Sequence, residues 1–116
     1  MPSTTEITVS QLSRLIGLPH TPIIISASNG VPVTSVETCG DADDIFVDTK
    51  RSRVYVSCGA GFVDVFDTKT YQLIARVTTV EGARTSLFVP EIDRLFVAAR
   101  ATPKAPASVW VFRPEP

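Results

Sequence analysis

The sequence predicts a mainly β fold built from antiparallel sheets. Short runs rich in Val, Ile, Phe, Tyr and Thr, residues that favour strands, recur between turns that contain Asp, Gly and Pro. The runs are apolar at successive positions, as in "IFV", "LFV" and "LFVAA", which is typical of strands covered on both faces. The same pattern of runs and turns also occurs twice along the chain, which indicates stacked copies of one unit.

The repeat is visible when "IFVDTKRSRVYVS" (45–57) is aligned with "LFVPEIDRLFVA" (87–98). In this alignment Ile45 falls on Leu87, and the turn between the two runs is one residue shorter in the second copy. "VDVF" (63–66) matches "VWVF" (109–112), and "YQLIARVTTV" (71–80) supplies a fourth run to the first copy. Each period therefore holds about four short strands. Radial stacking of such sheets would bury both faces of each sheet.

Composition limits the class of protein. With 116 residues, 44% hydrophobic and 20% charged, the chain suits one globular domain over residues 1–116. The formal charge is −1 and the cationic residues are scattered, so no nucleic-acid partner is expected. No run reaches the ~20 apolar residues of a membrane span, and the N-terminus lacks the pattern of a secretory signal. A soluble, cytoplasmic protein without a membrane partner is expected.

The N-terminal residues 1–28 read as a leader, and residues 29–116 as two sheets of the repeating kind. A short helix is predicted after the N-cap residue Ser10, with an apolar face and a glycine stop at Leu12, Leu15, Ile16 and Gly17. Runs 22–26 and 32–38, joined through Asn29-Gly30, predict a hairpin.

Two resemblances follow from these motifs. "RVYV" (53–56), "RLFV" (94–97) and "VDVFD" (63–67) resemble the second and third strands of bacterial YVTN/NHL-type β-propellers, and the likeness covers about residues 33–113. It implies propeller-like blades, about two in this chain, in a fold that serves binding scaffolds and enzymes alike. "EITVSQLSRLIGLPHTPIIIS" (6–26) is similar to the first strand and helix of rhodanese-type domains, but nothing later in the chain continues that likeness.

Such propellers need six or seven blades, so two blades predict self-association. Three copies of a two-bladed unit would complete a six-bladed ring, and the partner is therefore the protein itself, as a trimer. The run "VWVF" ends the second copy without a fourth strand. The N-terminal strand, of the same chain or of a neighbour, is expected to supply it.

Six residues are candidates for a ligand site: Cys39, Asp41, Asp43, Asp44, Cys58 and Arg84. The three aspartates could hold a hard cation, although aspartates before a strand are also ordinary turn formers. The propeller likeness brings Cys39, Asp41 and Cys58 to one end of a blade, where Arg84 could bind an anion. A disulfide, a soft-metal site and two inert thiols all fit the cysteines, and in a cytoplasmic protein two free thiols are favoured. No dedicated metal site, catalytic residue or cofactor is predicted.

The favoured function is a non-catalytic binding or interaction module that assembles with itself. Two alternatives come from the candidate residues. The first is a thiol-based enzyme or redox protein, a sulfurtransferase-like remnant, with Cys39 or Cys58 as the nucleophile. The second is a protein that binds a metal or an anion through residues 41–44 and Arg84. His20 is the only histidine, so a catalytic triad and a histidine-based metal site are excluded.

Overall fold

A computed structural model describes the backbone of residues 6–9, 21–26 and 32–116, and the side chains from residue 36 onward. Within these residues the chain forms ten strands and one short 3₁₀ helix, η1 (Pro90–Ile92). The strands are β1 (Glu6–Val9), β2 (Thr21–Ser26), β3 (Pro32–Thr38), β4 (Ala42–Asp48), β5 (Arg53–Cys58), β6 (Phe62–Asp67), β7 (Leu73–Thr78), β8 (Thr85–Val89), β9 (Arg94–Ala99) and β10 (Ser108–Phe112). The predicted helix after Ser10 lies outside the described residues. Among those residues no helix has the length and apolarity to cross a membrane.

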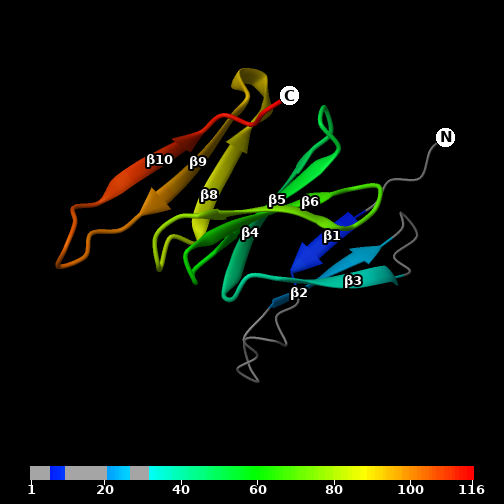
Figure 1. The fold of residues 1–116 in the computed structure, drawn as a ribbon, viewed down its shortest axis with the longest axis horizontal. Helices are drawn as coiled ribbons and strands as arrows, with labels where there is room; N and C mark the ends of the chain where they lie inside the picture. The colour runs from blue at the N-terminus through cyan, green and yellow to red at the C-terminus, as the bar shows by residue number, and fades with distance from the viewer. Residues whose placement is uncertain (1–5, 10–20, 27–31) are drawn as a thin grey trace.

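The strands form three sheets that follow one another along the chain (Figure 1). The N-terminal sheet has the order β1-β2-β3, the central sheet β4-β5-β6-β7 and the C-terminal sheet β10-β9-β8. Every pairing is antiparallel. The mainly β, antiparallel prediction is therefore confirmed, and each sheet is a simple meander of sequential strands.

The N-terminal strands pair locally. β2 and β3 form the predicted hairpin, with Ile23 opposite Val36, while the turn through Asn29-Gly30 lies outside the described residues. β1 pairs with β2, and the only described partner of β10 is β9. The expectation that the N-terminal strand closes the last sheet within the same chain is therefore wrong. Pairing of β1 with β2, the next strand in the sequence, costs less chain entropy than a pairing across most of the sequence.

The central sheet is covered on both faces, as the successive apolar positions predicted. Side chains of β5 alternate between two buried clusters, because neighbouring residues of a strand point to opposite faces. Val54, Val56 and Cys58 pack in a cluster with Val36 of β3. Tyr55 packs in the other cluster with residues of the C-terminal sheet, which are Phe88, Leu95, Val97 and Ala99. The central sheet thus lies between the other two (Figure 1).

The strands β8, β9 and β10 form the same kind of antiparallel meander as β4, β5 and β6, while the repeat itself stays a prediction. The strand registers correct the alignment by one residue in the first run. Phe46 lies opposite Tyr55, and in the second copy Leu87 lies opposite Phe96. Leu87 therefore takes the place of Phe46, and not that of Ile45, since the shorter turn before β9 shifts the pairing.

Candidate functional site

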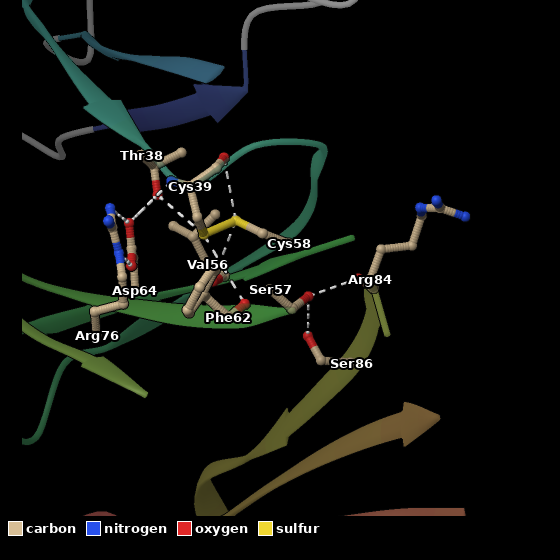
Figure 2. The surroundings of a disulfide bond; sticks show 10 residues. All are labelled: Thr38, Cys39, Val56, Ser57, Cys58, Phe62, Asp64, Arg76, Arg84 and Ser86. Atoms are coloured by element: carbon tan, nitrogen blue, oxygen red, sulfur yellow. Dashed lines mark hydrogen bonds and ion pairs between the residues drawn. A yellow bond between two sulfur atoms is a disulfide. The ribbon is translucent and has the colours of Figure 1, made fainter. Parts of the chain in front are cut away.

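Cys39 and Cys58 form a disulfide bond at the junction of the N-terminal and central sheets (Figure 2). Their Cα atoms are 5.9 Å apart, within the usual range for disulfides, and both residues are buried. The pairing of Ala42 with Cys58 brings the turn after β3 to the end of β5. The expectation of two free thiols is therefore wrong. It rested on an assumed reducing compartment, whereas the register of β4 against β5 places the two cysteines within bonding distance.

Asp41 and Arg84 form an ion pair beside the disulfide. The Nε and Nη2 atoms of Arg84 donate to Oδ2 of Asp41 over 2.8 and 2.5 Å. The amide of Gly59 donates to the carbonyl oxygen of Asp41, at 2.8 Å. A Cβ atom at residue 59 would lie 2.0 Å from Oδ2 of Asp41, so the ion pair requires glycine there. The predicted grouping of Cys39, Asp41, Cys58 and Arg84 at one end of the sheet is observed.

The acidic cluster joins the central sheet to β8 of the C-terminal sheet. Asp44 accepts a hydrogen bond from the amide of Ser86 at 2.8 Å, next to a 2.6 Å bond from the Ser57 hydroxyl to the carbonyl oxygen of Arg84. Asp43 is exposed. In the part of the chain with described side chains, no three His, Cys, Asp or Glu side chains are arranged to hold a metal ion. The cation-site alternative therefore has no geometric support, since Asp41 and Asp44 bind protein groups.

An ion pair between a buried carboxylate and an exposed arginine, on the other side of the disulfide, was not predicted (Figure 2). Asp64 is fully buried and accepts two hydrogen bonds from Arg76, over 2.7 and 2.9 Å. It also accepts from the hydroxyl of Thr38 and from the amide of Cys39, each at 2.9 Å. The hydrogen bond to Asp64 raises the pKa of Arg76 above its ordinary value. The sequence does contain a sign of this ion pair, which is an aspartate within the apolar run "VDVF". A carboxylate buried in such a strand needs a charged or hydrogen-bonding partner.

A second ionic cluster lies at the β4–β5 turn. The carboxylate of Asp48 is buried and accepts from the Tyr55 hydroxyl at 2.6 Å and from Nη1 of Arg51 at 3.0 Å. The same Nη1 atom binds Asp93, before β9, at 3.1 Å. Burial, then the hydrogen bond to Asp48, raises the pKa of Tyr55 to about 12. Hydrogen bonds from Arg51 and Lys50 lower the pKa of Asp93.

A cavity of about 410 Å³ lies between the central and C-terminal sheets. Its walls are mostly apolar, and two arginines and the residues after β10 line it as well. The lining residues are Arg53, Tyr55, Val63, Val65, Ile74, Ala75, Val77, Leu95, Phe112, Arg113, Pro114 and Glu115. None of the predicted site residues lines this cavity.

Comparison of the chain with family models, with curated proteins and with solved structures yields no match. The likeness to YVTN/NHL-type propellers and to rhodanese-type domains stays a prediction from the motifs. What the molecule can do is therefore argued from its own geometry.

Proposed function

We propose that the chain is a non-catalytic interaction module that binds further copies of itself by stacking sheet on sheet, in the manner of propeller blades. The proposal depends on one surface, here called the outer face, which consists of Leu87, Phe96, Val109 and Val111. These side chains share one side of the C-terminal sheet, because the register pairs Leu87 with Phe96 and Phe96 with Val111. Leu87, Val109 and Val111 are each more than half exposed.

The repeat explains what the outer face is suited to bind. Its four residues occupy the positions that Phe46, Tyr55, Val63 and Val65 hold in the central sheet. In the central sheet this face packs against the C-terminal sheet. The face that is buried in the central sheet is therefore exposed in the C-terminal sheet. A further sheet of the same kind would bury it, at roughly 1.5 kcal/mol or more for each large apolar side chain.

The number of sheets bears on the size of the assembly. Counting the N-terminal sheet, one chain supplies three sheets, so two copies would provide the six sheets of a small ring. The sequence-based expectation of two blades per chain required three copies. We favour a contact between the outer face of one copy and the N-terminal sheet of the next, because this continues the order of stacking seen within the chain.

Replacing single residues of the outer face by glutamate tests the proposal. Val111→Glu and Leu87→Glu should convert an assembly into single chains, because each places a charge in the contact. Ile92→Glu is the matched control, since Ile92 is 55% exposed but lies in η1, away from the outer face. Sedimentation velocity should show wild type and Ile92→Glu assembling alike. Assembly that persists unchanged in both outer-face variants would contradict the proposal.

The cysteines bear on the alternative function and on location. Both sulfur atoms are held in one buried disulfide, so neither is a thiolate nucleophile in this form, and no observation favours the thiol-enzyme alternative. A disulfide of this kind favours an oxidising compartment over the cytoplasm that composition suggested.

A further inference from the structure

The cavity between the central and C-terminal sheets has a structural cause. The central sheet has four strands and the C-terminal sheet three, and β7, the fourth, is exposed along most of its length. Val63 and Val65 of β6 and Val77 of β7 form one apolar wall of the cavity. Leu95 and Phe112 of the C-terminal sheet form part of the other. Its volume of about 410 Å³ is in the range of sites for small molecules.

The polar groups of this cavity are mainly cationic. Arg53 and Arg113 line it together with the residues that follow β10. Nη1 of Arg53 donates a 2.7 Å hydrogen bond to the main-chain carbonyl oxygen of Glu115. An oxygen acceptor therefore already occupies the position in front of this guanidinium. A carboxylate is a stronger acceptor than a carbonyl group, and its planar shape matches the guanidinium fork.

We propose that this cavity binds a small amphipathic carboxylate, with the apolar body between the two sheets and the carboxylate on Arg53. Arg113 adds positive charge at the same site, whereas the Glu115 side chain opposes an anion. The site lies within one chain and does not share a residue with the outer face. It is therefore independent of the proposed self-association.

Isothermal titration of the full chain with decanoate tests the site, with decanol as the neutral analogue. Decanoate should bind saturably, one molecule per chain, and more tightly than decanol. Arg53→Met should weaken decanoate binding about tenfold, the effect of losing one charge-assisted hydrogen bond. Arg94→Met is the matched control, because Arg94 holds the repeat position of Arg53 and donates instead to the carbonyl oxygens of Ile92 and Asp93.

Two further variants separate the cavity from other apolar surfaces. Ala75→Phe fills the cavity from an exposed position on β7 and should abolish binding without lowering the melting temperature. Glu115→Gln should tighten binding by removing a like charge. Val111→Glu, a change on the outer face, should bind decanoate as wild type does. A lack of saturable binding, or equal binding by wild type, Arg53→Met and Ala75→Phe, would overturn the proposal.

Discussion

Asp64 connects three segments of the molecule through one buried carboxylate. It binds Thr38 and Cys39 at the end of the N-terminal sheet and Arg76 on β7. The ring of Phe62 adds a cation–π contact, with the Arg76 guanidinium carbon 5.6 Å from the ring centroid. The carboxylate thereby satisfies donors that would otherwise be buried without a partner.

Replacement of Asp64 by alanine should therefore be costly. Asp64→Ala leaves the Thr38 hydroxyl and the Cys39 amide without their acceptor, and we expect a loss of about 3 kcal/mol in the free energy of unfolding. Glu81→Ala, at an exposed turn residue, is the control and should change it by less than about 0.5 kcal/mol. Urea denaturation measures both. A cost for Asp64→Ala as small as that of the control would show that the buried carboxylate and its partners do not stabilise the fold.

Tyr55 predicts a loss of stability at high pH. Its pKa is raised to about 12, by burial and by the hydrogen bond to Asp48, from the ordinary value of 10.0. Between these values the unfolded chain has lost the phenol proton and the folded chain keeps it, so stability falls as pH rises from 10 toward 12. Difference absorbance at 295 nm between wild type and Tyr55→Phe isolates this ionisation. If the ionisation that Tyr55→Phe removes has its midpoint near pH 10, the ordinary value, the burial of the hydroxyl is contradicted.

At the residue scale, the sequence predicted which residues lie close together, but it did not predict the bonds that they form. The propeller likeness implied that Cys39, Asp41 and Cys58 lie at one end of a blade, with Arg84 at the same face. Their bonding did not follow, because a disulfide depends on the register of β4 against β5. The pairing of Asp64 was missed because its partner Arg76 lies on the next strand, and only the fold shows that the two face the same side.

At the scale of elements, the disulfide holds the end of β5 to the turn between two sheets. It closes a loop with a sequence separation of 19 residues. By the chain-entropy argument, its loss should lower the free energy of unfolding by about 3 kcal/mol. The double variant Cys39→Ala/Cys58→Ala, compared with oxidised wild type by urea denaturation, measures this. Native wild type that reacts with maleimide at two thiols per chain without reductant would contradict the bond.

The strands themselves were largely predictable. The β-branched and aromatic runs marked β4, β5, β6, β7, β8 and β9 because tertiary packing here agrees with local preference. The pairing of β1 was not predictable in the same way, because its short apolar run fits more than one edge. The sequence alignment also placed β8 one residue out of register. Leu87 and Phe88 are both apolar, so the sequence does not show which of them points to which face of the sheet, and only the length of the turn to β9 determines it.

At the scale of the molecule, three sheets follow one another, and the central sheet is covered on both sides. Successive apolar positions predicted this two-sided cover for every sheet. In the C-terminal sheet the structure shows it on one side only, with Leu87, Val109 and Val111 exposed on the other. We propose that this uncovered face receives another copy of the chain.

The mass of the wild-type chain in solution, measured by sedimentation equilibrium over micromolar concentrations, tests this claim most directly. Self-association through the outer face predicts a discrete assembly with a mass that is a whole multiple of the 12.5 kDa chain and that dissociates on dilution into single chains. A dimer would give a six-sheet ring if each chain contributes three sheets, and a trimer would do so if each chain contributes two. A mass of 12.5 kDa at every concentration would contradict it.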